Sequence, residues 1–215
     1  MGVKAFGTAL VGLGLVGLAG CAGRGELDET GGVTAVRSAC PTVAVPAGTG
    51  DVTLFDPATS QDASAIDMTA VLTNVRSTCN DAGEQIGTAV TFDIDARRMR
   101  TTGPRDVDLR YFITVVRGGS AVVAKRIGTV RVHFDAGQGR AVTRGQASAT
   151  VSRAAATLPA DIRAQLTRRR KAGEEDAATD PLTQPQVRQA VLRASFEALV
   201  GFQLTDVQLR YNATR

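Results

Sequence analysis

Residues 89–98 read Ala-Val-Thr-Phe-Asp-Ile-Asp-Ala-Arg-Arg, and this stretch decides the fold class. Val90, Phe92 and Ile94 alternate with polar neighbours such as Thr91 and Asp93. A period of two places one set on each face of an extended chain, whereas a helix needs a period of 3.6. The stretch therefore predicts a β-strand with one buried face and one solvated face.

The same alternation recurs on both sides of this stretch, from residue 40 to residue 155. Glycines interrupt it at Gly118-Gly119 and at Gly137 and Gly139, where we expect turns. About seven strands in such a length are typical of a β-sandwich of the immunoglobulin or fibronectin type. Because the chain has no tryptophan, the hallmark of true immunoglobulin domains is missing and the prediction concerns architecture only.

The N-terminus has the pattern of a secretory signal, with one lysine followed by an apolar run from Ala5 to Leu18. This run is shorter than the roughly 20 residues that a membrane-spanning helix needs. Leu18-Ala19-Gly20-Cys21 resembles the lipobox of bacterial lipoproteins. The resemblance implies that residues 1–20 are a signal peptide and that Cys21 becomes an acylated N-terminus, carrying chains such as palmitate. Plain secretion and an uncleaved anchor are the alternatives.

Two cysteines, Cys40 and Cys79, remain once Cys21 is assigned to lipid. An even pair in an exported chain predicts a disulfide, worth about 3–4 kcal/mol in the loop-entropy model. The alternatives are a redox dithiol, which favours Cys-x-x-Cys spacing, and a metal site, for which His133 is a distant third ligand. Alternation places Cys79 on an inward strand face, so we expect a buried bridge.

Residues 21–39 are small, polar and rich in glycine, and we interpret them as a flexible tether between the lipid and the folded part. The residue after the cysteine is Ala22, where an aspartate would resemble an inner-membrane retention signal, so we expect the outer membrane. The mature chain carries 24 Lys and Arg against 21 Asp and Glu, since only Lys4 is lost with the leader. This mild charge and the export signal argue against nucleic acid as a partner.

Residues 156–184 change character. Pro159-Ala160-Asp161 is typical of a helix start, and Ile162 and Leu166 give a short amphipathic pattern. The basic run 168–171 is followed by the acidic run 174–176. Adjacent blocks of opposite sign predict a solvated helix end and loop, with binding of anionic lipid or lipopolysaccharide as the alternative.

Residues 185–215 predict a C-terminal helical segment. Thr183 is a candidate cap with Pro185 in the first turn, and the apolar stripe continues until Gly201. Thr205 is a candidate N-cap of a second helix. The segment either packs on the sandwich, which we favour, or docks on a partner.

The sequence offers few side chains as candidates for catalysis or metal binding. Asp93 and Asp95 share a strand face and suit calcium or two-carboxylate chemistry, but no third ligand accompanies them, and we interpret them as solvent-side aspartates. His133 is the single histidine, on a polar strand face, with no nucleophile motif nearby in the sequence, and we interpret it as a surface residue. We expect no metal, cofactor or catalytic site.

Two strings carry a family resemblance: Cys-Pro-Thr-Val-Ala-Val-Pro at 40–46 and Phe-Gln-Leu-Thr-Asp-Val-Gln-Leu-Arg-Tyr-Asn at 202–212. Together with the lipobox, they resemble uncharacterised outer-membrane lipoproteins of alphaproteobacteria. Some lipoproteins of this kind and size are accessory to the β-barrel assembly machinery, which implies an outer-membrane assembly partner. In the tail, Phe202, Gln203, Gln208 and Tyr211 are then candidate partner contacts, with capping and closing of the fold as their other role.

The sequence therefore predicts a lipid-anchored outer-membrane protein that faces the periplasm and has a non-enzymatic accessory or scaffold role in outer-membrane assembly or maintenance. A module that binds a small ligand, glycan or lipid is the second hypothesis, and it requires a concave apolar pocket. A hydrolase is the third, and it requires His133 beside an acid and a nucleophile.

Overall fold

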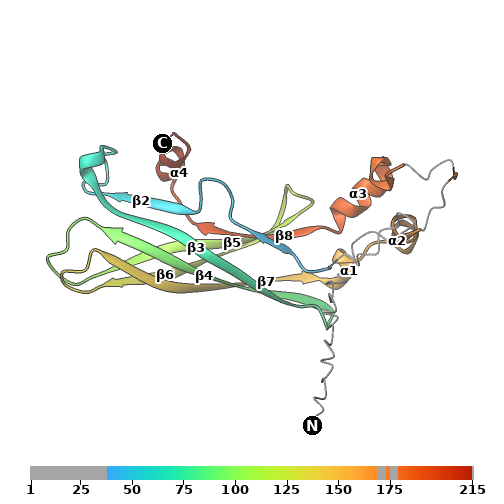
Figure 1. The fold of residues 1–215 in the computed structure, drawn as a ribbon, viewed down its shortest axis with the longest axis horizontal. Coiled ribbons are helices and arrows are strands. Elements are labelled where there is room, and N and C mark those ends of the chain that lie inside the picture. Colours follow the sequence, from blue (N-terminus) through green and yellow to red (C-terminus); the bar gives the residue numbers. More distant parts are fainter. Residues whose placement is uncertain (1–37, 169–172, 175–178, 215) are drawn as a thin grey trace, which may run out of the picture.

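The computed structural model describes residues 38–168, 173–174 and 179–214. The predicted leader, Cys21 and most of the tether lie outside these residues, as do parts of the basic and acidic runs near residue 170. Eight strands within the described ranges form two four-stranded sheets packed as a β-sandwich (Figure 1), which confirms the predicted fold class.

The first sheet has, in spatial order, β1 (Thr42–Ala44), β8 (Phe196–Phe202), β5 (Arg105–Arg117) and β6 (Ala121–Phe134). The second sheet has β2 (Asp51–Phe55), β3 (Ile66–Asn80), β4 (Gln85–Arg98) and β7 (Arg140–Ser152). Neighbouring strands are antiparallel except β1 and β8. The orders β3-β4-β7 and β8-β5-β6 match strands A-B-E and F-C-C′ of the immunoglobulin arrangement. The differences are that β1 takes the outer place beside β8 but runs parallel to it, that β2 pairs with β3 beyond the position of strand A, and that no described strand lies beyond β7.

The predicted alternation of β4 is observed residue by residue. Val90, Phe92, Ile94 and Ala96 are buried between the sheets, while Thr91 and Arg97 are exposed. The largest side chains with under 2% exposure come from both sheets: Phe92, Phe134, Phe202, Met68, Ile86 and Ile94. Burial of such side chains, at about 1.5–3 kcal/mol each, is what holds the two layers together.

The C-terminal segment differs from the predicted helix. Helix α3 (Pro185–Arg193) begins with the expected proline, but its N-cap is Gln184, and the chain then enters β8, a central strand of the first sheet. Phe196, Ala198, Val200 and Phe202 alternate into the core and pair with β5. Gly201 therefore lies within a strand and ends no helix. The sandwich extends beyond residue 155, because β8 belongs to it.

Helices α1 (Arg153–Ala156), α2 (Ala160–Thr167) and α3 lie at one end of the sandwich (Figure 1). Helix α2 starts after Pro159, as predicted. Its Ile162 packs with Val187 and Ala190 of α3 in a second, smaller apolar cluster. Short 3₁₀ helices occupy Ala63–Ala65 and Pro181–Thr183, and α4 (Asp206–Thr214) closes the described chain.

Candidate functional site

The tail residues predicted as partner contacts are engaged within the molecule. Phe202 is 1% exposed and belongs to the core, so a partner has no access to it. Thr205 caps α4 as expected: the backbone N–H of Gln208 donates to the Thr205 hydroxyl (3.3 Å), and the Thr205 N–H donates to the Gln208 side-chain oxygen (2.9 Å). This reciprocal pair is a capping box.

The rest of α4 packs on the sandwich. The ring of Tyr211 lies edge-on to Phe55 of β2, with centroids 5.1 Å apart. The Asn212 amide donates to the carbonyl oxygens of Gly48 and Asp51, each at 2.9 Å. Gln203 is half-buried beside Leu204. Helix α4 therefore packs on the sandwich, whereas α3, the helix for which packing was predicted, packs on α2.

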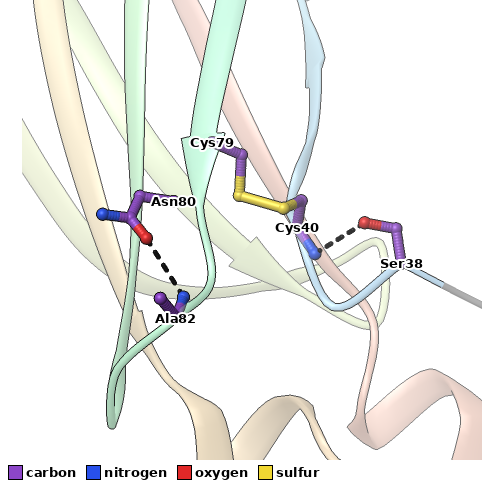
Figure 2. Close-up of a disulfide and its surroundings, with 5 residues drawn as sticks. All are labelled: Ser38, Cys40, Cys79, Asn80 and Ala82. Carbon is purple, nitrogen blue, oxygen red and sulfur yellow. Dashed lines mark hydrogen bonds between the residues drawn. A yellow bond between two sulfur atoms is a disulfide. The ribbon is translucent and has the colours of Figure 1, made fainter.

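Cys40 and Cys79 form the predicted disulfide (Figure 2), with their Cα atoms 6.1 Å apart. Cys40 lies two residues before β1 of the first sheet and Cys79 lies on β3 of the second, so the bond joins the two layers along one lateral edge. The expectation of a buried bridge is wrong, because Cys79 is exposed and Cys40 is only half-buried. Beyond Val71, β3 has no pairing with β2, and its outer half borders solvent.

Asp93 and Asp95 are each bound by an arginine of the neighbouring strand β7. Asp93 accepts from Arg144 (3.1 Å) and from the amide of Asn74 (2.7 Å), and Asp95 accepts from Arg140. The Asn74 and Arg144 hydrogen bonds lower the pKa of Asp93, and the Arg140 hydrogen bond lowers that of Asp95. Both carboxylates are thus held ionised by cross-strand pairs, as expected of solvent-side aspartates.

His133 lies directly across from Asp106 in the β5–β6 ladder. Its Nδ1 is 2.6 Å from Asp106 Oδ1, and its Nε2 is 3.4 Å from Asp135 Oδ1. The hydrogen bond with Asp106 and the charges of both carboxylates raise the pKa of His133 above 6.5. Because both ring nitrogens face carboxylates, the geometry favours the charged imidazolium.

A buried carboxylate escaped the sequence analysis. The Asp67 side chain is 6% exposed and accepts hydrogen bonds from Arg105 (2.6 Å) and Arg100 (3.0 Å). The Arg105 hydrogen bond is the main cause that lowers the pKa of Asp67, with burial acting in the opposite direction. Since Asp67 is on β3 and Arg105 on β5, this ion pair ties the two sheets together.

The structure also holds a groove that the sequence did not reveal. It has a volume of about 460 Å³ and lies between the outermost strands of the two sheets, β6 and β7. Val90 and Ile113 line its floor, and segments 126–128 and 146–148 line its sides. Small residues occupy inward positions of the two edge strands here, Gly128 on β6 and Ala147 on β7, and the Tyr111 ring fills the space beside Gly128.

One hydrogen bond spans this groove. The Tyr111 hydroxyl of β5 donates to the carbonyl oxygen of Gln146 on β7 (2.6 Å), and the Tyr111 ring lies edge-on to Phe92, with centroids 5.2 Å apart. Gly128 lies directly beside the ring, where an added Cβ would overlap the phenol. The two sheets are therefore joined covalently at one lateral edge and by a neutral hydrogen bond at the groove.

The edge of β6 beside the groove is open. Residues 121–127 are exposed, with Val122 at 64% and Ile127 at 50%. Among the described strands, β6 pairs only with β5, and β7 only with β4. An edge strand of this kind presents a row of unpaired backbone N–H and C=O groups. The sequence signal was weak, because the run Ala-Val-Val-Ala-Lys-Arg-Ile-Gly at 121–128 has no clear alternation.

Positive charge surrounds this open edge. Arg126 lines the groove, the Lys125 ammonium lies 5.1 Å from the centre of the Phe112 ring on the opposite sheet face, and Arg117 lies at the end of β5. In the part of the chain that the structure describes, none of these three cations has a carboxylate oxygen within 4 Å, unlike Arg131 and Arg140. The site is therefore an apolar hollow with a cationic rim.

Comparison of the chain with protein-family models, with curated proteins and with solved structures found no match. Among the described residues, no helix has the length and hydropathy of a membrane span. In the same residues, no group of three or more His, Cys, Asp or Glu side chains has the arrangement of a metal site. The β6–β7 groove is the candidate functional site.

Proposed function

We propose that this chain is a lipid-anchored protein of the bacterial outer membrane that faces the periplasm. Its sandwich serves a non-enzymatic accessory or scaffold role in outer-membrane assembly or maintenance. The observation that carries the proposal is the pairing of Cys40 with Cys79. Because the chain has three cysteines, this bridge leaves Cys21, the residue of the lipobox-like sequence, as the one cysteine outside it.

Two further features support an anchored protein, the disulfide and the length of chain before Cys40, and the energetics of acyl chains explain why such a protein would stay attached. A disulfide is typical of an oxidising compartment. Several acyl chains on one residue make release from a bilayer slow, at ~0.8 kcal/mol per buried methylene group. The interval from Cys21 to Cys40 spans up to ~60 Å when extended, which is enough to hold the sandwich clear of lipid headgroups.

The scaffold role draws support from the chemistry of the surface. The charged side chains with catalytic potential, Asp93, Asp95 and His133, are held in ion pairs within the sheets. The exposed apolar residues of β6 and the groove beside it form a surface suited to binding. A partner-binding role therefore accounts for the site better than a reaction does.

The anchor is tested by mass spectrometry of the mature N-terminus and by membrane fractionation. We expect Cys21 to carry acyl chains, and Cys21→Ser to give a soluble or uncleaved protein. The matched control is Cys40→Ala with Cys79→Ala, which removes the other two cysteines and their disulfide without removing the anchor and should stay in the membrane fraction. A processed Cys21→Ser variant that remains in the membrane would refute the anchor.

The scaffold role is tested with a photo-crosslinking amino acid at position 127 in living cells, compared with the same group at position 188 on α3. We expect the groove position, but not the α3 position, to capture a component of outer-membrane assembly or maintenance. Equal capture at both positions, or none at position 127, would contradict the role.

The groove also favours a second candidate, a small-ligand, glycan or lipid-binding module. Its volume of about 460 Å³ lies in the range of small-molecule pockets, and its floor is apolar. Native mass spectrometry of the purified protein tests this function. A retained small molecule that is lost from Ala147→Phe, which fills the groove, would support it.

A further inference from the structure

We propose that the groove and the open edge of β6 bind an extended, acidic polypeptide segment of a partner protein, which adds to the sheet as a strand beside Ala121–Gly128. The inference names the kind of partner for the proposed scaffold role, and it rests on that role for the location of the partner. Three properties of the site support it: the unpaired backbone, the shape of the hollow and the charge.

The backbone property comes from the sheet order. Since β6 is the last strand of its sheet, one side of its backbone has no partner strand among the described residues. Adding a strand to such an edge supplies main-chain hydrogen bonds along its length. Natural proteins usually protect an open edge with a covering segment, a proline, a β-bulge or charged side chains, lysine above all. Here, residues 121–128 contain no proline, and Lys125 and Arg126 supply charges. The register with β5 shifts at Val123, so the regular part of this edge is Ala124–Gly128.

The shape property comes from residue size. In an added strand, alternate side chains would point toward the space between the sheets. On the β6 side that space is bordered by Gly128 and on the β7 side by Ala147, and its floor is formed by Val90 and Ile113. The Tyr111 ring fills the space beside Gly128, and the part of the hollow beside Ala147, Val90 and Ile113 is the part that suits apolar side chains of an incoming strand. Because it follows the strand edges and is open to solvent, it suits an extended chain better than an enclosed small molecule.

The positive charge of the site favours an acidic strand as its occupant. Arg126 lies at an inward position opposite Ile113, and Lys125 lies at an outward position opposite Thr114. An added strand with two consecutive acidic residues would meet both cations. A second copy of this chain paired through its own β6 would instead bring the Lys125 and Arg126 side chains of both copies together, which is unfavourable because like charges on paired strands repel.

The experiment uses the purified full chain, as the expressing cell processes it, and a fluorescein-labelled peptide, Val-Thr-Val-Glu-Glu-Val-Thr-Val. We expect saturable binding by fluorescence anisotropy. Arg126→Glu should weaken it by roughly tenfold. The matched control is Arg188→Glu, since Arg188 is an exposed arginine of α3 with no ion pair among the described residues, and it should leave the affinity unchanged.

Two control peptides separate strand addition from simple charge attraction. Replacing Glu-Glu by Lys-Lys should abolish binding, and N-methylating alternate amides on the edge that faces β6 should also abolish it, because the backbone donors are lost. The proposal would be overturned if the N-methylated peptide still bound, or if the Arg126→Glu variant bound the peptide with the same affinity as the wild type. The proposal would also be overturned if a fatty acid displaced the peptide while neither Arg126→Glu nor N-methylation of the peptide changed the affinity.

A second copy as the occupant is tested by sedimentation without peptide. We expect a monomer. A dimer that Ile127→Asp converts to a monomer would overturn the proposal in favour of self-pairing. These measurements do not depend on Cys21, so a failure of peptide binding is distinguishable from a failure of the anchor, which N-terminal mass spectrometry reports separately.

Discussion

The Tyr111 hydroxyl donates a 2.6 Å hydrogen bond to the carbonyl oxygen of Gln146, and this contact joins the two sheets across the groove between β6 and β7. Tyr111→Phe removes the hydroxyl but keeps the ring against Phe92. We expect a loss of about 0.5–1.5 kcal/mol in the free energy of unfolding, measured by urea denaturation. A variant as stable as wild type would show that water replaces the bond without cost.

The ring of Tyr111 also depends on the glycine beside it. Gly128→Ala places a methyl group in the space of the phenol, and we expect a destabilisation of about 1–3 kcal/mol from overpacking. Gly87→Ala in β4 is the matched control, because a Cβ there meets no atom within 4 Å. Thermal unfolding of both variants is the measurement, and equal melting temperatures would contradict the steric argument.

The Cys40–Cys79 bond closes a loop with a sequence separation of 39 residues. Replacing both cysteines by alanine should cost about 3–4 kcal/mol in the loop-entropy model. Unfolding of wild type with a reductant should show a similar loss, whereas the double variant should not respond to reductant. A double variant with wild-type stability would show that the packing of β1 alone closes that edge.

The Asp67–Arg105 pair predicts a dependence of stability on pH. Because the folded-state pKa of Asp67 is lowered below 3.8, its contribution is present above that value and is lost as the pH falls through the folded pKa. Asp67→Asn should cost about 1–3 kcal/mol at pH 7, and the difference from wild type should shrink below about pH 4. Asp108→Asn, an exposed ion-pair control, should cost much less. A pH-independent difference would exclude the ionic explanation.

His133 provides a second titration, with the opposite sign. Its folded-state pKa is raised above 6.5, chiefly by the hydrogen bond with Asp106, so its contribution to stability is present below pH 6.5 and is lost as the pH rises through the folded pKa. The single imidazole can be followed by proton NMR. We expect a midpoint above 6.5 that moves down in Asp106→Asn. An unchanged midpoint in that variant would rule out Asp106 as the cause.

Much of the sandwich could be predicted because its information is local. The alternation at Val90, Phe92 and Ile94 defines which face of β4 is buried, whatever its neighbours are. The Thr205–Gln208 capping box is likewise a local pattern, formed by residues three apart. The disulfide could be predicted from the cysteine count, since only Cys40 and Cys79 remain once Cys21 is assigned to lipid.

Strand β8 shows where local information ends. Residues 196–202 continue an apolar stripe that also fits a helix, and their alternation is too short to exclude one. The strand form is stabilised by pairing on both sides, antiparallel with β5 and parallel with β1. Those partners are remote in the chain, so the pattern of the segment alone could not select between the two structures.

The residue pattern alone established a β-sandwich with a capped C-terminal helix and a Cys40–Cys79 bridge, because strand alternation, capping and cysteine count are properties of neighbouring residues or of composition. Tertiary structure decided that Phe202 is core and that Asp67 meets Arg105. It also placed Ala147 and Arg126 beside the groove between the two edge strands, with the Tyr111 ring against Gly128. These features arise from contacts between distant segments, and such contacts exist only once both sheets have formed.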